Sequence, residues 1–275
     1  MVRMRKGVLL LLFAVTVWSA APAAMQAAAI ELTAPVKADF DKTVKGADAG
    51  SAAKLKQLYP ALQASLNEDL QLKAQIKAQH YANEQALLAL RKEIRLVDGA
   101  KLDKLKGEVA QMKAKYKPLF DEYTALNKQI AIVRKLKSKL LNDALRFQAD
   151  AMKVATQLAR DKIRAKETEL KNAKAAAAAK IKAARNTLGE TDTLKVKIKS
   201  LNSAAALPRK SQSAVWTDFK YAIKKSETRS ALNALDTLAS LAKQVADKQR
   251  EVLAAEKKIA AVIAKTKTQI AAAGK

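Results

Sequence analysis

The side chains with the clearest chemical potential in this sequence are lysines and arginines, with three aromatic rings among them. Residues 160–225 hold 17 basic and 6 acidic side chains. Such cations attract phosphate, sulfate and carboxylate groups, and aromatic rings beside them can stack on bases or sugars. The candidate aromatic tip is Trp216, Phe219 and Tyr221. The candidate polyanion-binding residues are Lys180, Lys182, Arg185, Lys195, Lys197, Lys199, Arg209, Lys210, Lys220, Lys224 and Lys225.

Both groups also have a structural interpretation. Trp216 and Phe219 are three residues apart, which is the spacing of side chains that pack together against a partner helix. Packing into a small core at the end of a helical hairpin is the favoured interpretation for these two rings. Lysines, in turn, keep the outer faces of long helices solvated, so the charge alone does not establish a binding surface.

Motifs of enzymes and of metal sites are missing from the sequence. There is no Gly-rich phosphate loop, no nucleophilic serine motif and no cysteine. His80 is the only histidine, so a metal ion there would lack further nitrogen or sulfur ligands. We expect no catalysis, no cofactor and no bound metal. His80 and Asn83 interrupt an apolar stripe, and we predict that this polar pair fixes the register of two helices.

The whole chain is strongly basic. Its 52 Lys and Arg side chains against 26 Asp and Glu give a net charge of +26. Lys outnumbers Arg by 40 to 12, and a flexible ammonium group suits diffuse binding to polyanions better than the planar fork of Arg. An anionic envelope polymer or a lipid surface is therefore the expected partner, and no small-molecule substrate is expected.

The first 29 residues have the three-part order of an export signal. Arg3, Arg5 and Lys6 precede an apolar run that ends at Trp18, and an alanine-rich stretch follows. The apolar run has about a dozen residues, whereas a membrane span needs roughly 20. We predict a signal peptide over 1–29, cleaved after Ala29 or alternatively after Ala23, and a secreted or envelope-associated protein. A retained N-terminal anchor helix is the alternative.

Apolar residues between positions 119 and 158 recur with alternating steps of four and three. A period of 3.5 residues is typical of a helix that keeps one stripe against a partner in a left-handed coiled coil. We predict that this stripe is the spine of one long helix over about 100–185, with a kink or short break just before Pro118. The stripe consists of Leu119, Tyr123, Leu126, Ile130, Val133, Lys137, Leu140, Ala144, Phe147, Ala151, Val154 and Leu158.

Other segments flank this spine. Residues 30–51 contain one proline and two glycines and are predicted to form a flexible lead-in to an elongated coiled-coil domain over 52–275. Gly189 is expected to end the spine by adopting a left-handed conformation. A short helix is expected to follow as far as Pro208, and a last helix to begin near Ser213.

Together these expectations describe an all-α fold, an extended antiparallel coiled coil or long helical hairpin of about three long helices with a short helical tip segment. The first helix would fold back along the N-terminal part of the spine, and the last would return along its C-terminal part. This arrangement places the basic residues 160–225 at the distal tip. Pairing between chains is the alternative, because heptad spacing does not separate self-pairing from homo-oligomerisation.

The expected function is that of a secreted, non-enzymatic scaffold or spacer, held at the cell envelope by electrostatic binding to anionic polymers or lipid headgroups. A chaperone-like holdase that binds unfolded clients is the first alternative. The predicted architecture resembles that of periplasmic holdase chaperones, without a shared motif. Extracellular nucleic-acid binding is the second alternative, and it would show a steep loss of affinity with rising salt.

Overall fold

The computed structural model describes residues 30–273, and 94% of this part is helical, with no strand. The all-α prediction is therefore confirmed. The signal peptide predicted over 1–29 lies outside the described residues. The helices are α1 (Ala34–Gly46), α2 (Ala49–Arg95), α3 (Gly99–Lys135), α4 (Lys139–Lys224) and α5 (Thr228–Ala273).

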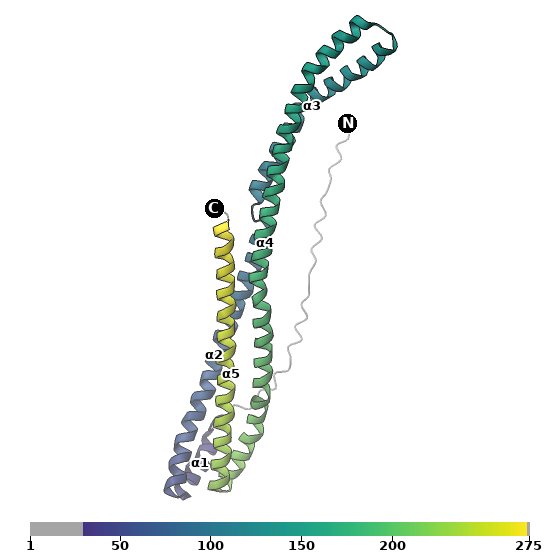
Figure 1. Ribbon diagram of the computed structural model, residues 1–275. Helices are drawn as coiled ribbons and strands as arrows, with labels where there is room; N and C mark the ends of the chain where they lie inside the picture. Colours follow the sequence, from purple (N-terminus) through teal and green to yellow (C-terminus); the bar gives the residue numbers. More distant parts are fainter. Residues whose placement is uncertain (1–29, 274–275) are drawn as a thin grey trace, which may run out of the picture.

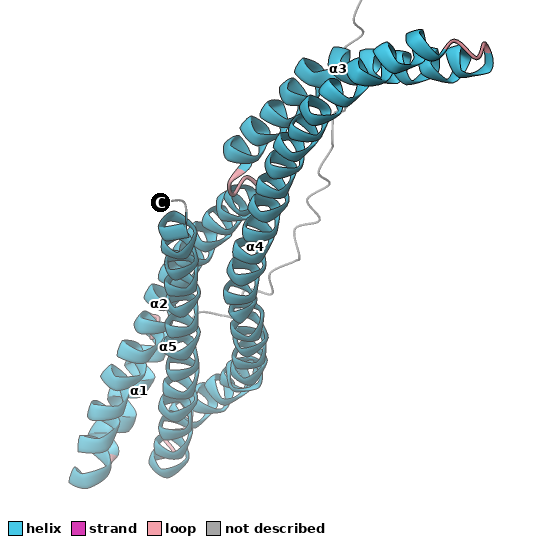
Figure 2. Cartoon of the chain, turned by 45° about the horizontal axis from the view of Figure 1, so that its top comes forward, coloured by secondary structure: helices cyan, strands magenta, loops and turns pink. Residues whose placement is uncertain are grey.

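The described chain forms an elongated rod with two parts (Figure 1). Helix α4 has 86 residues, which corresponds to about 130 Å, and runs the full length of the rod. Along one half it packs against α1, α2 and α5, and we call this part the body. Along the other half it pairs with α3 alone, and we call α3 with residues 139–180 of α4 the arm. The arm bends toward its end (Figure 2).

Single residues in left-handed conformation mark the three junctions between the long helices. Asp98 (φ 56°) stands between α2 and α3, Lys137 (φ 54°) between α3 and α4, and Ser226 (φ 53°) between α4 and α5. Non-glycine residues adopt this region at a steric cost. The junctions at Lys137 and Ser226 reverse the chain, whereas α3 continues in roughly the direction of α2 (Figure 1).

The closed end of the body holds the aromatic core of the protein. Phe40 from α1, Leu62 from α2, Phe219 from α4 and Leu235 from α5 are buried together. The rings of Trp216 and Phe219 stack with their centroids 5.2 Å apart. This cluster contains most of the large apolar side chains of α1, and it anchors that short helix on the long ones.

A second apolar cluster lies near the other end of the body. It joins Leu87 and Leu90 of α2, Leu188 of α4 and Ile259 of α5. These side chains recur every three or four residues on their helices, as expected for faces that meet in a bundle. The two clusters together hold α2, α4 and α5 side by side over the whole body.

The predicted spine is not one helix. Its stripe is interrupted at residues 136–138, where the chain turns back, so the N-terminal half lies on α3 and the C-terminal half on α4. No break occurs before Pro118, because α3 continues through this residue as one helix. Pro118 is exposed, and water can bond the carbonyl group that its missing N–H leaves free.

Three boundaries predicted farther along the chain are wrong. Helix α4 continues through Gly189 and Pro208 and past Ser213. No glycine in residues 30–273 has a positive φ, so Gly189 does not act as a helix stop. Its neighbour Leu188 is buried in the second cluster, and this packing keeps the segment helical.

The flexible lead-in predicted over residues 30–51 is likewise wrong for most of its length. Pro35 stands at the start of α1, where a missing N–H costs nothing because the first helical N–H groups have no partner in the helix. Asp48 then caps α2 by accepting a hydrogen bond from the Ser51 backbone N–H at 2.9 Å.

The long-range pairing differs from the predicted hairpin in one respect. The last long helix packs antiparallel to α4, as expected, but α2 packs mainly against α5 and hardly against the spine. There are thus four long helices rather than about three, and the distal tip of the rod is the turn at residues 136–138 (Figure 1).

Candidate functional site

The predicted polyanion-binding residues are strung along the body instead of gathered at a tip. Positions 180 to 225 span about 68 Å of helix α4 and its end. The basic concentration predicted at the distal tip therefore does not lie there. It extends along α4 from the base of the arm to the α4–α5 turn.

Three of these residues tie helices together. Lys180 pairs with Asp98 at 2.9 Å, Lys195 with Glu84 at 2.7 Å, and Arg209 with Asp69 at 3.0 Å. The hydrogen bond from Lys195 is the main reason that the pKa of Glu84 lies below its ordinary value. These cations join α4 to α2 or to the α2–α3 junction, so part of the predicted set serves the fold.

The other eight predicted residues form no ion pair with a carboxylate in the described part of the chain, and most of them are exposed. They are Lys182, Arg185, Lys197, Lys199, Lys210, Lys220, Lys224 and Lys225. Such groups present unneutralised positive charge to solvent, which is what a diffuse polyanion surface needs.

The aromatic tip is divided by the fold. Trp216 and Phe219 are 3% and 0% exposed in the aromatic core, so neither ring can stack on a base in this conformation. Tyr221 is exposed, and the Lys225 ammonium lies 5.9 Å from its ring centroid. Only Tyr221 is available at the surface.

The densest arginine group was not recognised from the sequence. Arg91 and Arg95 on α2 and Arg185 on α4 line one open groove of about 280 Å³. Leu188 and Gly189 also line the groove. A β-carbon at Gly189 would meet no side chain or neighbouring helix within 4 Å, so the space beside this residue is open.

None of these three arginines forms an ion pair with a carboxylate of residues 30–273, although the charge of Arg91 contributes to the lowered pKa of Glu84. Asp192 is the acidic residue at the rim. The described chain contains ten arginines, so three of ten meet in this groove. The i, i+4 spacing of Arg91 and Arg95 was the available signal, but their convergence with Arg185 needed the tertiary structure.

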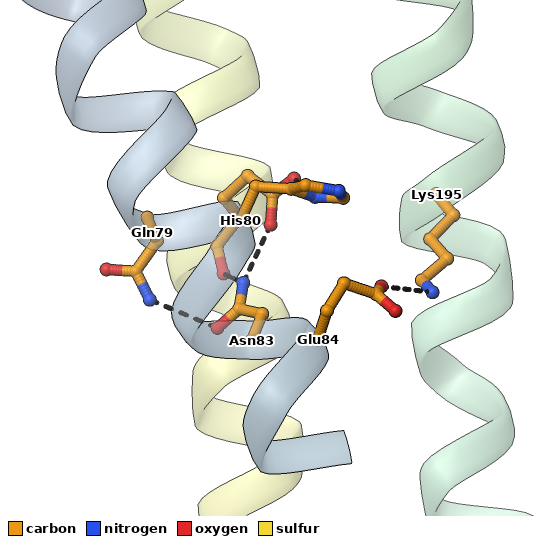
Figure 3. A network of polar contacts seen from close by, with 6 residues as sticks. Gln79, His80, Asn83, Glu84 and Lys195 are labelled. Carbon is orange, nitrogen blue, oxygen red and sulfur yellow. Dashed lines mark hydrogen bonds and ion pairs between the residues drawn. The ribbon is translucent and has the colours of Figure 1, made fainter. Parts of the chain in front are cut away.

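A polar network joins α2 and α5 in the body (Figure 3), with Asn83 and Glu256 buried and His80 exposed. The Glu256 carboxylate is 2% exposed and lies 2.8 Å from His80 Nδ1, and it accepts a hydrogen bond from Asn83 Nδ2 at 2.7 Å. Asn83 Nδ2 also donates to the Glu256 carbonyl oxygen at 2.9 Å. The polar pair predicted to fix helix register therefore does join two helices.

No group of His, Cys, Asp and Glu side chains within residues 30–273 is arranged to hold a metal ion. The His80 network contains one carboxylate and one imidazole, and the Asn83 amide donates the other hydrogen bonds to Glu256. The network therefore supplies hydrogen-bond partners to the buried Glu256 carboxylate.

No protein-family model, curated protein or solved structure matches this chain. None of the described helices has an apolar stretch long enough to cross a bilayer.

Most of the cationic side chains in the described part of the chain form no ion pair. Residues 30–273 hold 48 Lys and Arg side chains and all 26 Asp and Glu side chains. Twelve of these cations lie within 4.0 Å of a carboxylate, which leaves 36 with no carboxylate partner in this part of the chain. The described part of the chain therefore presents positive charge to solvent at many places along its length.

Proposed function

We propose that this protein is a non-enzymatic, exported scaffold or spacer that binds anionic polymers or lipid headgroups at the cell envelope. The observation that carries the proposal is that 36 cations of residues 30–273 have no carboxylate partner in this part of the chain and lie along a narrow helical rod. A rod of about 130 Å exposes these charges over a long surface, so a polyanion can follow it and neutralise many of them at once.

The arginine groove is the position where we expect the tightest contact. A guanidinium group donates two parallel hydrogen bonds to one phosphate or carboxylate, and three such groups meet here. The lysines of α4 would then hold the neighbouring anionic groups less specifically. The groove thus adds a preferred position to a diffuse surface.

The first test is fractionation of the native host, followed by stepwise salt extraction of the envelope. We expect the protein to sediment with the envelope and to come off at about 0.5–1 M salt, where charge screening is nearly complete. Recovery in the free soluble fraction at low salt would contradict the proposal. Release by detergent alone would mean that a membrane anchor holds the protein.

A matched set of variants tests the groove. The triple change Arg91→Gln, Arg95→Gln and Arg185→Gln should lower the salt needed for release and weaken binding to vesicles containing anionic lipid about tenfold. A control removes the same charge from three exposed lysines without ion pairs, Lys54, Lys77 and Lys101, and should weaken binding about twofold. Equal losses in the two variants would mean that only net charge matters.

Charge-conserving substitutions separate the effect of the paired guanidinium donors from the effect of the positive charge. Arg91→Lys, Arg95→Lys and Arg185→Lys keep the net charge but remove the paired donors. If the groove recognises single phosphate or carboxylate groups, this variant should lose most of the affinity that the glutamine variant loses. Full retention of affinity would assign the groove to the diffuse surface.

A holdase function is the second candidate, because the arm exposes large apolar side chains. Leu140, Phe147 and Val154 are 86%, 80% and 72% exposed. A holdase should suppress aggregation of an unfolded client at 0.5 M salt, where a polyanion binder no longer binds. Competition between DNA and envelope polymer separates the envelope proposal from nucleic-acid binding, since both depend on salt.

A further inference from the structure

The outer face of α4 in the arm carries a regular apolar stripe that nothing in the described chain covers. We call it the outer seam, and its members are all exposed: Leu140, Ala144, Phe147, Ala151, Val154 and Leu158. Steps of four and three alternate without exception over these 19 positions. The stripe is the C-terminal half of the coiled-coil pattern that the sequence predicted.

The same helix segment already has a partner on its other side. Ala149, Thr156 and Ala159 are buried against α3, and Leu145 and Met152 are half-buried on the same face. At 100° per residue, this inner face and the outer seam lie roughly 150° apart. The segment is therefore apolar on two opposite faces, and the α3–α4 pairing uses only one of them.

We infer that the outer seam binds the outer seam of a second copy of this chain, in antiparallel orientation, so that two rods join arm to arm. The spacing favours a helix as the occupant, because a strict 3.5-residue seam is the narrow stripe of a coiled coil. Pairing of identical seams also closes by a two-fold axis, as most homodimers do.

Side-chain sizes fit this orientation. An antiparallel seam centred between Phe147 and Ala151 places Phe147 against Ala151 of the second copy. It likewise places Ala144 against Val154, and Leu140 against Leu158. The two inner layers then combine a large side chain with alanine, and the end layers pair two leucines. Parallel pairing would instead place an Ala–Ala layer on each side of one Phe–Phe layer, which leaves gaps in a coiled coil.

The charges beside the outer seam also favour the antiparallel orientation. Asp143, Arg146, Asp150 and Lys153 follow one flank, alternate in sign, and form no ion pair with another residue of 30–273. In the antiparallel pair this flank faces itself, which brings Arg146 and Lys153 of one copy within reach of Asp150 and Asp143 of the other. The two Asp150 side chains also approach each other near the two-fold axis, where the two Arg146 side chains can neutralise them. In a parallel pair it would face Leu141, Gln148 and Ala155, and the four charges would stay without partners.

A lipid surface suits the outer seam less well. Helices that lie in a membrane interface have a wide apolar face bordered by Lys and Arg. Here the residues directly beside the seam on one flank are Asp143, Asp150 and Gln157, and an anionic bilayer would repel the two aspartates. The residues directly beside the seam on the other flank, Leu141, Gln148 and Ala155, include no cation. The seam is also narrow, with apolar residues at only two of every seven positions.

The seam spans about 27 Å of helix, so the interface is small. Interfaces below about 1,200 Å² are typical of weak complexes, and we expect dissociation at about 10–100 µM. This inference does not depend on the proposed function, since it concerns the purified chain without any polyanion.

Sedimentation equilibrium of the purified protein at about 5–500 µM in 0.15 M salt tests the dimer. We expect a monomer–dimer equilibrium that Phe147→Asp weakens at least tenfold, with an unchanged far-UV circular dichroism spectrum. Leu207→Asp is the control, because Leu207 is 71% exposed on the body, and it should leave the equilibrium unchanged. A monomer at every concentration, or a dimer insensitive to Phe147→Asp, overturns the inference.

Cysteine cross-linking tests the orientation, because the chain has no cysteine of its own. The double variant Ala144→Cys with Val154→Cys should form a covalent dimer on oxidation, whereas Ala144→Cys alone should not. Cross-linking of the single variant would establish a parallel pair and overturn the antiparallel arrangement.

Charge reversal provides a rescue experiment. Asp143→Lys with Asp150→Lys should weaken dimerisation, since the whole flank becomes positive. Adding Arg146→Asp and Lys153→Asp restores alternating signs and should restore the dimer. Failure of this rescue would overturn the proposed flank pairing.

Discussion

Asn83 on α2 and Glu256 on α5 are joined by two hydrogen bonds from one amide group. Asn83 Nδ2 donates to Glu256 Oε2 at 2.7 Å and to the Glu256 carbonyl oxygen at 2.9 Å, in a part of the body where both side chains are buried. An unpaired polar group at such a depth is costly, so the pair is satisfied only when the two helices keep this register.

Asn83→Ala should therefore lower the free energy of unfolding by about 2–3 kcal/mol, because a buried carboxylate loses a charge-assisted donor. Chemical denaturation measures the change. The double variant Asn83→Leu with Glu256→Leu removes both polar groups and should recover most of this loss, as apolar replacement of buried polar pairs often does. Equal destabilisation by both variants would mean that side-chain size matters here and hydrogen bonding does not.

Acid should weaken the ion pairs between helices, because it protonates their carboxylates. Hydrogen bonds from Arg250, Lys195 and Lys166 lower the pKa values of Glu68, Glu84 and Glu108 below the ordinary 4.5. A lowered pKa in the folded state contributes stability that is complete above pH 4.5 and is lost as the pH falls through the folded value.

The melting temperature should accordingly be flat from about pH 7 to 5 and fall below about pH 4.5. Glu84→Gln should reduce the drop, because it removes one of the titrating groups. A control at Glu93, which is exposed and has no ion pair in the described chain, should leave the profile unchanged. A melting temperature that rises in acid would contradict the assignment.

Ser226 should be a site of backbone strain. Its φ of 53° is left-handed, and its backbone N–H donates to the Ile223 carbonyl oxygen at 3.0 Å at the end of α4. Ser226→Gly should raise the melting temperature, whereas Ser226→Val should lower stability by about 1–2 kcal/mol relative to the glycine variant. Thermal unfolding followed by circular dichroism measures both, and the reverse order of the two variants would contradict the strain.

The two halves of the predicted spine should respond differently to a charge. Val133 is buried between α3 and α4, so Val133→Asp should destabilise the arm by at least about 2 kcal/mol. Val154 lies on the outer seam, and Val154→Asp should leave the stability of the monomer unchanged. Hydrogen exchange should localise the first effect to the arm, with the body still protected. Equal effects of the two changes would mean that both halves are buried.

Much of the local structure was predictable from the sequence, because helix formation depends on nearby residues. The sparse turn-forming residues and the 3.5-residue period predicted long helices, and the structure contains them. The spacing of Trp216 and Phe219 predicted packing, and both rings are buried. His80 and Asn83 were predicted to face a partner helix for the same reason.

The turns were less predictable, because local signals and packing disagreed. Gly189 and Pro208 each weaken an isolated helix, yet both lie within α4. Nearby residues of α4, such as Leu188 and Ala205, are buried against other helices, and this burial outweighs the helix-breaking cost of the glycine and the proline. In the sequence, Lys137 is the one charged residue of the predicted stripe from Leu119 to Leu158. It is the residue where the chain reverses, and the steps from Val133 to Lys137 and on to Leu140 keep the heptad count across the turn.

The sequence by itself determined that this protein is basic and helical and that its helices carry stripes in need of a partner. Only the tertiary structure decided which stripes meet. It paired α2 with α5, brought Arg91 and Arg95 next to Arg185, and left the stripe from Leu140 to Leu158 exposed. The physical reason is that a heptad stripe specifies its own width and period but not its partner, which is chosen by packing summed over the whole rod.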